Sequence, residues 1–386
     1  MFREDKRRFL LDAVDRIRPM LEANAAEAEA IATLPKATVA ALVDAGLFRL
    51  KLPSVLGGAE ADPVLQMDVI EAVTRIDPSA GWCVMIGASA IGMPGAFLPD
   101  DVLGQVFVNG RIPTAAGVFM PTGQATRVGG GYRVTGRWSF ASGIRHAEWV
   151  SGTAVLNGNE DGTRTTLRMV MPVSAVQIHD NWQVAGLKGT GSCDFTATDV
   201  FVADAFAWDV ERAQPRRSGP VYRLGLPAFV ANEHVALACG AAFRALDEVT
   251  ALAISKRRGL GAPSLLASRG SFQRTLGECE LRLRAVRALA VELNEQAWAT
   301  IQTGTPVDPT LQTQLRAVAT LVTDVAVDVA SHAFRAAGGG ALYQTSVLQR
   351  CLRDLHAGAQ HLMVSDSAYE NLGQLRLGFP DVNPMG

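Results

Sequence analysis

The spacing of apolar residues changes twice along this chain of 386 residues, and each change marks a different kind of structure. From residue 3 to about residue 103, apolar residues recur every three or four positions, as on one face of a helix. From residue 111 to about residue 209, short segments rich in Val, Thr and Phe alternate around glycine turns, which is typical of strands. After a linker at 214–220, helical spacing returns and holds almost to the end.

The sequence therefore predicts a mostly helical protein with a central antiparallel β-sheet or β-barrel. We expect an N-terminal helical domain over residues 1–110, a middle β domain over 111–212 and a C-terminal helical domain over 213–386. The last domain contains four helical stretches much longer than an average helix, the fourth running from "TSVLQRC" to "ENLGQL". Four such helices predict an antiparallel four-helix bundle.

Composition narrows the class of protein. The formal net charge of −2 argues against a nucleic-acid-binding surface. The five cysteines are scattered, odd in number and never spaced C-x-x-C, which favours reduced thiols over disulfides or a zinc site. The charged N-terminus does not resemble a signal peptide, and we expect no uncharged run long enough for a membrane span. A cytoplasmic protein without membrane or metal is the expectation.

No common nucleotide, metal or hydrolase motif is present, so any chemistry must be sought elsewhere. The segment "GRWSFASGIRHAEWV", residues 136–150, places two tryptophans, a Ser-Gly pair, an arginine and a histidine within fifteen residues. A serine hydroxyl at Ser142 is a short and rigid hydrogen-bonding group, and Gly143 allows close approach of the backbone to a ligand. The alternative is an ordinary Ser-Gly turn.

Three motifs, together with the helix–sheet–helix order, resemble the acyl-CoA dehydrogenase superfamily. They are "GGGYRVTGRWSFASG", "GLKGTGSCDFTATDVFVAD" and "CLRDLHAGAQH". The resemblance implies an N-terminal helical domain, a middle β-barrel and a C-terminal four-helix bundle around a flavin. Dehydrogenases of this type commonly follow the Arg-Asp pair with a Tyr-Glu-Gly-Thr segment that supplies a base, whereas this chain has Leu362 near that place and His361 beside it. The pattern is more similar to the oxygenase components of two-component flavin monooxygenases, of the hydroxyphenylacetate hydroxylase, steroid-ring phenol hydroxylase and dibenzothiophene monooxygenase types.

The resemblance to these oxygenases implies reduced FMN or FAD, supplied as a co-substrate by a separate flavin reductase. With O2, the protein would hydroxylate an aromatic or other small organic substrate through a flavin hydroperoxide, in a water-poor chamber between barrel and bundle. No metal is needed. A homotetramer is the expected assembly.

The resemblance and the chemistry of individual residues together assign residues to the site. Ser142 would lie near flavin N5, and His361 would act as acid or base on the substrate, with Gly358 one helical turn earlier leaving room for a ring. His356 is interpreted as structural. Further flavin contacts would come from Trp138, Phe140, Thr190, Ser192, Arg258 and Gln273, and substrate contacts from Trp82 and His146. For each of these, core packing, a polar turn or a solvated helix end is the alternative.

Two other functions stay open at this point. An acyl-CoA dehydrogenase that performs αβ-desaturation with bound FAD would need a base, and Glu233 stands where a minority of such enzymes keep theirs. Against a dehydrogenase, the segment "GVFMPTGQAT" lacks the Thr-Glu-Pro motif that these enzymes usually carry before the β domain. The remaining possibility is a helical scaffold or an inactive relative of these enzymes, which would bind no flavin.

Overall fold

The computed structural model describes residues 2–157, 164–259, 263–380 and 382–385. Contacts divide the chain into two compact units. The first contains Met1–Ala61, Trp82–Gln183 and Lys188–Tyr222, and the second contains Asp62–Gly81, Val184–Leu187 and Arg223–Gly386. One of the borders between the two units falls inside helix α4 (Pro78–Phe97). The order of N-terminal helices, middle sheet and C-terminal helices is confirmed, while the domain borders at 110/111 and 212/213 stay predictions.

The helices of the first unit begin and end where local chemistry favours it. They are α1 (Arg3–Ile31), α2 (Lys36–Asp44), α5 (Asp100–Val106) and most of α4. Gly46, which follows α2 within two residues, has a φ of +73° and stops that helix in the left-handed conformation that glycine adopts without strain. Helices α4 and α5 cover one face of the sheet, where Ile91 and Val102 pack with Val170 and Trp208.

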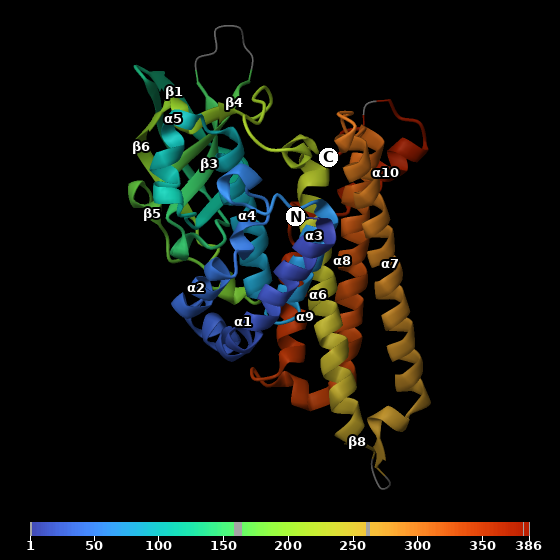
Figure 1. The fold of residues 1–386 in the computed structure, drawn as a ribbon. Helices are drawn as coiled ribbons and strands as arrows, with labels where there is room; N and C mark the ends of the chain where they lie inside the picture. Colours follow the sequence, from blue (N-terminus) through green and yellow to red (C-terminus); the bar gives the residue numbers. More distant parts are fainter. Residues whose placement is uncertain (1, 158–163, 260–262, 381, 386) are drawn as a thin grey trace. The chain divides into compact units, whose positions relative to one another are not determined.

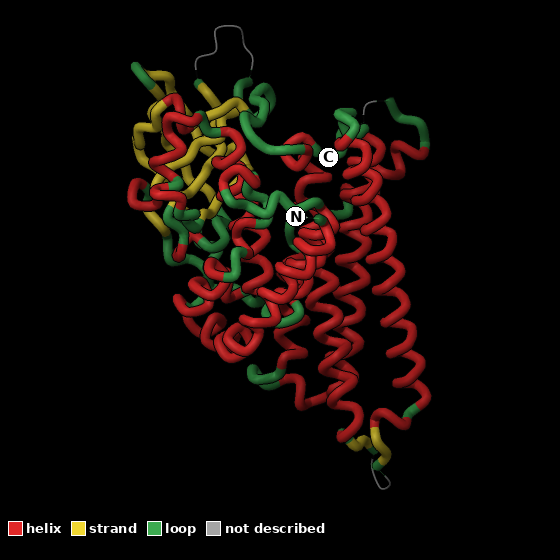
Figure 2. Tube along the Cα trace, viewed as in Figure 1, coloured by secondary structure: helices red, strands yellow, loops and turns green. Residues whose placement is uncertain are grey.

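The middle of the chain forms a seven-stranded sheet, coloured yellow in Figure 2. Its strands are β1 (Ala115–Val128), β2 (Gly131–Trp138), β3 (Trp149–Leu156), β4 (Thr166–Pro172), β5 (Gln177–Ile178), β6 (Phe195–Ala203) and β7 (Ala207–Asp209). They lie in the order β5-β6-β2-β1-β3-β4-β7.

Two features of the predicted β domain need correction. Within the described residues, no pairing joins edge strands β5 and β7, so the sheet is not a closed barrel. The sheet is also not wholly antiparallel, because β1 and β3 run parallel from Ala115↔Trp149 onward. The physical reason is the chain path: β2 returns antiparallel to β1, and the next connection enters β3 beside the start of β1 rather than pairing β3 with β2.

Glycines in the sheet make room for one aromatic side chain. Trp138 is fully buried, stacks on Phe195 with ring centroids 4.9 Å apart, and donates from Nε1 to the carbonyl oxygen of Thr153 over 2.8 Å. A Cβ on Gly123 or Gly152 would lie 2.2 or 2.7 Å from the indole ring, closer than atoms can approach. Some of the many glycines in this part of the sequence are therefore needed because a larger residue would collide with the Trp138 ring.

The second unit is helical. It contains α3 (Pro63–Thr74), α6 (Leu226–Ser255), α7 (Gly270–Gln302), α8 (Pro309–Ala337), α9 (Val347–Gly358), α10 (Ser367–Arg376) and a small hairpin of β8 (Arg257–Arg258) and β9 (Ser264–Leu265). Figure 1 shows α6, α7 and α8 running alongside one another. Two Asp-Pro pairs start helices here: Asp62 caps α3, and Asp308 accepts from the backbone N–H groups of Thr310 and Leu311 in α8.

The fourth long helix expected in the bundle does not form as one piece. Helix α9 ends at Gly358, a 3-10 turn η11 (Leu362–Val364) follows, and α10 begins at Ser367. Helical spacing of apolar residues continues through the break, but Arg316 on α8 takes the carbonyl oxygen of Leu362 and the hydroxyls of two serines in the turn as acceptors. These tertiary hydrogen bonds outweigh the local preference for helix.

Two helices have the length and apolar character of a membrane span. They are Pro78–Phe97, which carries no charged residue, and Pro309–Leu342. The expectation that no uncharged run reaches this length is therefore wrong. However, 83% and 61% of their most apolar windows are buried inside the protein, as in core helices of proteins without a membrane.

Candidate active site

Ser142 lies in a turn that two loops of the first unit hold in place. Strand β2 ends at Trp138, so Ser142 follows the strand rather than lying on it, just before the 3-10 turn η4 (Ile144–His146). The backbone N–H of Ala141 donates to the carbonyl oxygen of Cys193, and that of Gly143 donates to Thr190. Gly143 has a φ of +76°, and a Cβ there would lie 2.9 Å from Nε2 of His146. The turn therefore needs glycine at this position.

Four of the predicted site residues form one chain of hydrogen bonds. The Trp82 Nε1–H donates to Ser142 Oγ over 2.8 Å, Ser142 Oγ lies 2.7 Å from Ser192 Oγ, and Ser192 Oγ lies 2.7 Å from Thr190 Oγ1. All four side chains are buried. The sequence predicted each as a contact residue, but nothing in it indicated that they contact one another.

The chain of hydroxyls bears on the roles of three predicted contact residues, which stay predictions. Thr190 and Ser192, the predicted flavin contacts, are both buried, and their hydroxyls are engaged with each other and with Ser142. Trp82 was expected to cap the substrate, and its only polar atom instead points at Ser142. Trp82, Ser192 and Thr190 thus belong to the same chain of hydrogen bonds as Ser142.

The two aromatic residues beside Ser142 have opposite surroundings. Trp138 fills the core of the sheet and has no exposed surface, so it is not an accessible wall for a ligand as expected. Phe140 is 71% exposed and has a φ of +66°, a conformation that costs a side chain of this size about 1 kcal/mol or more. An exposed aromatic side chain in a strained backbone beside a buried hydroxyl is typical of a functional site.

His146 contributes an imidazole to the same turn. Its ring packs against Phe48, with centroids 6.2 Å apart, and burial lowers its pKa to about 4, so the ring is neutral at neutral pH. Among the described residues its buried Nδ1 atom has no hydrogen-bond partner. A buried polar atom without a partner is unusual, and a ligand that donates to it is a ready explanation.

His361 lies outside any α-helix, in the second unit. Its backbone is extended (φ −75°, ψ 138°), and its Nδ1 accepts from the Met363 N–H over 3.3 Å. The argument that Gly358 clears space one helical turn earlier therefore fails, because α9 ends at Gly358. Burial lowers the pKa of His361 to about 4, so its imidazole is neutral at neutral pH, and its role as acid or base on the substrate stays a prediction.

Two residues that sequence reasoning missed surround His361. The His234 ring on α6 lies with its centroid 4.4 Å from that of His361 and is itself buried. Arg316, only 2% exposed, donates to Leu362 O (2.9 Å), Ser365 Oγ (3.1 Å) and Ser367 Oγ (2.9 Å), and so fixes the turn that carries the imidazole. An arginine within the apolar run "QLRAVATLV" was the available signal.

The remaining predicted residues lie in the second unit with partners of their own. The Arg258 Nη2 donates to the carbonyl oxygen of Arg335 over 3.4 Å, and the Gln273 Nε2 donates to that of Ala267 over 2.9 Å. Gln273 and His356 are exposed, and Glu233 is buried. The flavin role of Arg258 and Gln273 stays a prediction.

The Arg-Asp pair of the late motif has a structural role. Asp354 Oδ1 accepts from the Leu187 N–H over 2.6 Å, and a Cβ on Gly186 would lie 2.0 Å from the carbonyl oxygen of Arg353. Two of the motifs that carry the family resemblance, "GLKG" and "LRDLH", are therefore in contact. Each of the two segments helps to hold the other in place.

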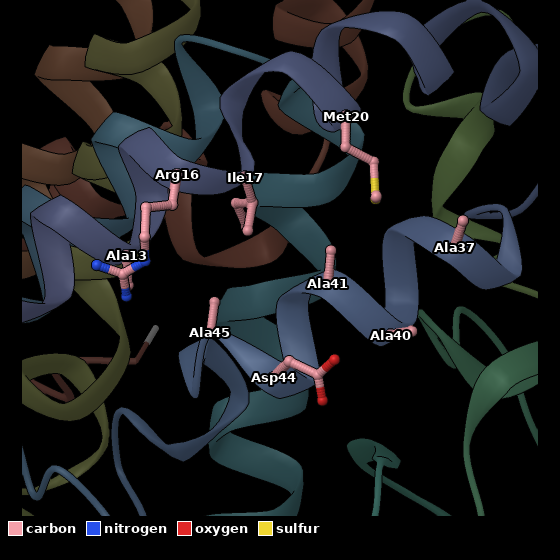
Figure 3. Close-up of a pocket in the computed structure, with 9 residues that line it drawn as sticks. All are labelled: Ala13, Arg16, Ile17, Met20, Ala37, Ala40, Ala41, Asp44 and Ala45. Atoms are coloured by element: carbon pink, nitrogen blue, oxygen red, sulfur yellow. The ribbon is translucent and has the colours of Figure 1, made fainter.

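Neither a metal group nor the pocket between α1 and α2 coincides with these sites. Among the described residues, no three His, Cys, Asp or Glu side chains come together to hold a metal ion. A pocket of about 510 Å³ lies between α1 and α2 and is lined mainly by alanines, with Arg16, Met20 and Asp44 (Figure 3). None of the predicted site residues lines it.

The Ser142 turn fits a planar ring with a hydrogen-bonding edge, such as a flavin. The exposed Phe140 ring offers an apolar face, the His146 Nδ1 lacks a partner, and Ser142 retains hydrogen-bonding capacity beyond its bonds to Trp82 and Ser192. The residues present are thus compatible with the cofactor that the sequence resemblance implied.

Comparisons with known proteins agree on the family. Residues 1–97 match the model of the acyl-CoA dehydrogenase N-terminal domain, and residues 233–366 match that of its C-terminal domain. Indole-3-acetate monooxygenase of Pseudomonas putida is 32% identical over 333 residues, which cover 86% of this chain and 84% of that protein. The oxygenase subunit HsaA of a flavin-dependent monooxygenase from Rhodococcus jostii is 28% identical over 390 residues, covering 97% of this chain and 100% of that protein.

A solved structure extends the agreement to three dimensions. The 3-HSA hydroxylase from Rhodococcus sp. RHA1 superposes with a TM-score of 0.87 at 25% identity, covering 98% of this chain and 99% of the other. The relatives are monooxygenases rather than dehydrogenases, which sets aside both αβ-desaturation with Glu233 as base and the non-enzymatic scaffold. The chain belongs to the acyl-CoA dehydrogenase family and, within it, to the flavin-dependent monooxygenases.

Proposed function

We propose that this protein is the oxygenase component of a two-component system that takes reduced FMN or FAD from a separate reductase and uses O2 to hydroxylate an aromatic or other small organic substrate. Relatives named as acting on indole-3-acetate and resorcinol support an aromatic substrate. The solved structure of XiaF from Streptomyces contains FADH2 and that of KijD3 contains FMN, which supports either flavin.

The observation that carries the proposal is the buried Ser142 hydroxyl. It lies where α4 and two loops meet, held by Trp82 and Ser192, next to the exposed and strained Phe140. A bound reduced flavin supplies the electrons that activate O2. Ser142 would bind the ring edge, Phe140 would exclude water from one face, and His146 Nδ1 would accept from a ring N–H.

His361 would act on the substrate side. Because its imidazole is neutral, it can accept a hydrogen bond from a substrate hydroxyl or N–H and take the proton as that group becomes acidic during reaction. The neighbouring His234 ring would limit how far the His361 ring can turn. Ser142 and His361 belong to different units, so their joint action in one chamber stays a prediction.

The test of the function uses labelled oxygen. The protein is mixed anaerobically with photoreduced FMN or FAD and a panel of phenols and indoles, and then exposed to ¹⁸O₂. We expect one labelled oxygen atom in the product, detected by mass spectrometry. Tightly bound oxidised flavin that an acyl-CoA bleaches would instead support a dehydrogenase and contradict the proposal.

Ser142→Ala tests the residue at the centre of the site. Loss of the hydroxyl leaves the Trp82 N–H without its acceptor and removes the ring-edge contact, so we expect product formation per O2 to fall about tenfold, with hydrogen peroxide released instead. Ser142→Thr, which keeps a hydroxyl, is the matched control. Equal coupling in Ser142→Ala and the unmodified protein would remove Ser142 from the site.

The expected assembly and location also stay proposals: a homotetramer in the cytoplasm. Long amphipathic helices such as α7, whose outer residues include the exposed Leu281 and Leu289, favour association between copies. Light scattering after size exclusion measures the assembly, and a monomer would refute it.

A further inference from the structure

Arg316 on α8 uses its two terminal nitrogen atoms for two different segments of the second unit. Nη2 donates to three oxygen atoms in and beside the turn that carries His361, over 2.9–3.1 Å. Nη1 donates to the carbonyl oxygen of Pro384 over 3.3 Å. One planar guanidinium group therefore joins the His361 turn to residues 382–385, which we call the tail segment.

The tail segment is bound through its backbone. In addition to the bond from Arg316 to Pro384, Asn371 on α10 donates from Nδ2 to the carbonyl oxygen of Asn383 over 2.9 Å. Both donors are buried, with exposed fractions of 2% for Arg316 and 7% for Asn371. Both acceptors are main-chain atoms, so these two bonds depend on the path of the segment and not on the side chains that it carries.

The charge of Arg316 makes the bond to the tail segment matter. In the part of the chain that the structure describes, all its acceptors are neutral carbonyl and hydroxyl groups, and its Nε has no partner. A buried cation is costly unless its N–H groups are satisfied. Loss of the Pro384 carbonyl oxygen would leave Nη1 unsatisfied as well. The guanidinium group would then move toward water, and its bonds to the His361 turn would weaken.

We propose that the tail segment and Asn371 are positioning elements for His361 and act through Arg316. With the tail segment bound, Nη1 and Nη2 are both engaged, and the turn keeps its place beside the His234 ring. With the segment released, the turn loosens and the imidazole loses its fixed position. The inference rests on the proposed function in taking His361 as the residue that acts on the substrate.

Release of the tail segment changes the imidazole chemically as well as in position. Burial holds the pKa of His361 near 4, so its ring stays neutral between about pH 5.5 and 7.5. Water that enters a loosened turn removes this burial, and the pKa rises toward the ordinary value of about 6.5. The ionisable groups near the ring or in its turn are His234 on α6, Arg316 on α8 and Asp366, and release of the segment removes none of them.

Carbethoxylation by diethyl pyrocarbonate, followed by peptide mass spectrometry, tests the positioning of His361 without a substrate. The reagent attacks the neutral imidazole, so the rate reports both access to the ring and its protonation. Asn371→Leu keeps the size of the side chain but removes the donor to Asn383. We expect it to raise the His361 rate at pH 7.5 about tenfold and to make the rate fall below about pH 6.5. The unmodified protein should react slowly and without that fall.

A second variant and a matched control accompany Asn371→Leu. A chain that ends at Val382 lacks both backbone acceptors and should give the same result, with an increase of about 30-fold. Pro384→Ala keeps the carbonyl oxygen and should react like the unmodified protein. The exposed His356 on α9 and the buried His146 of the first unit should react equally in every variant, which shows that the rest of the fold is intact.

The effect on the reaction is measured with ¹⁸O₂ in single turnovers. Asn371→Leu and the chain that ends at Val382 should each slow the formation of labelled product about tenfold, because the imidazole is no longer held at the substrate. The dissociation constant for reduced flavin should not change. Pro384→Ala should retain the rate.

The outcomes separate the inference from the function. Absence of labelled product from the unmodified protein would overturn the proposed function, and with it the role of the tail segment in the reaction. Labelled product together with equal His361 carbethoxylation in the unmodified protein and both release variants would overturn only the inference. An equal rise for His146 would show general unfolding, and an equal rise in Pro384→Ala would show that side-chain packing matters rather than the backbone acceptor. Either result would also overturn the inference.

Discussion

The Ser142 turn in the first unit and the His361 turn in the second hold their polar groups in different ways. Ser142 is one of four side chains in a line, and the three hydrogen bonds of that line have similar lengths of 2.7–2.8 Å. His361 depends on a single arginine, because Arg316 supplies three hydrogen bonds to the residues just after the imidazole. We therefore expect substitution of any one residue of the Ser142 line to have a small effect, and substitution of Arg316 to have a large one.

The two regions also differ in what flanks them. Loops that are bonded backbone to backbone fix the Ser142 turn, so it does not rely on a long side chain. The His361 turn separates helices α9 and α10, and its Leu362 carbonyl oxygen accepts from the long side chain of Arg316 as well as from Ser365 Oγ. Four measurements test this difference between the two turns.

Arg316→Met should have the largest effect on stability. It removes the charged donor that the Leu362 carbonyl and two serine hydroxyls share and leaves only the weaker bonds among these groups, so we expect the free energy of unfolding to fall by about 3 kcal/mol. Denaturant titration measures it. Arg316→Lys, which keeps the charge but not the forked geometry, should recover only part of the loss. A change below about 0.5 kcal/mol would show that the turn holds itself.

His361→Asn separates the chemistry of the imidazole from its role in the turn. The asparagine oxygen can still accept from the Met363 N–H, so the turn should form, while substrate hydroxylation should slow about 100-fold, with flavin binding unchanged. Single-turnover product analysis measures the rate. An equal loss of flavin binding would place His361 on the cofactor rather than on the substrate.

Acid should destabilise both regions through their histidines. Burial holds the pKa of His146 and of His361 near 4, below the ordinary 6.5, so the unfolded chain binds protons that the folded protein does not. The stability that each neutral ring contributes is complete above about pH 6.5 and is lost as the pH falls through about 4.

Unfolding titrations between pH 7.5 and 5 test this. Each of His146→Asn and His361→Asn should reduce the loss between these pH values by about 2 kcal/mol. A pH profile that neither substitution alters would mean that both rings are protonated in the folded protein at pH 5. A profile that only one substitution alters would mean that only that histidine has a lowered pKa.

Phe140→Gly should have the smallest effect and the opposite sign. Glycine adopts the positive φ without strain, so we expect a gain of about 0.5 kcal/mol in stability, together with weaker flavin binding because the exposed ring is lost. Thermal unfolding and flavin titration measure the two effects. Phe140→Asn, which tolerates this backbone conformation, is the control; loss of stability in both variants would mean that the Phe140 ring, which meets Trp182 edge to face, contributes more than its strain costs.

Sequence patterns predicted long elements well and their interruptions poorly. Periodicity located α6, α7 and α8, and Gly46 marked the end of α2, because apolar spacing and glycine conformation are local properties. The same periodicity ran through Gly358, where the contacts of Arg316 end the helix. Strand content was also predictable, whereas the parallel pairing of β1 with β3 depends on the path of a connection between strands.

Motifs and apolar periodicity are local properties of the chain, so they were enough to predict the family, the helix–sheet–helix order and a short list of polar residues. Contacts between distant segments set three further features. One line of hydrogen bonds joins Trp82, Ser142, Ser192 and Thr190. Trp138 lies in the core, the His234 ring lies beside that of His361, and Arg316 holds the turn that carries His361. The reason is that a hydrogen bond across 50 or 60 residues depends on where backbones cross, and no local propensity encodes that distance.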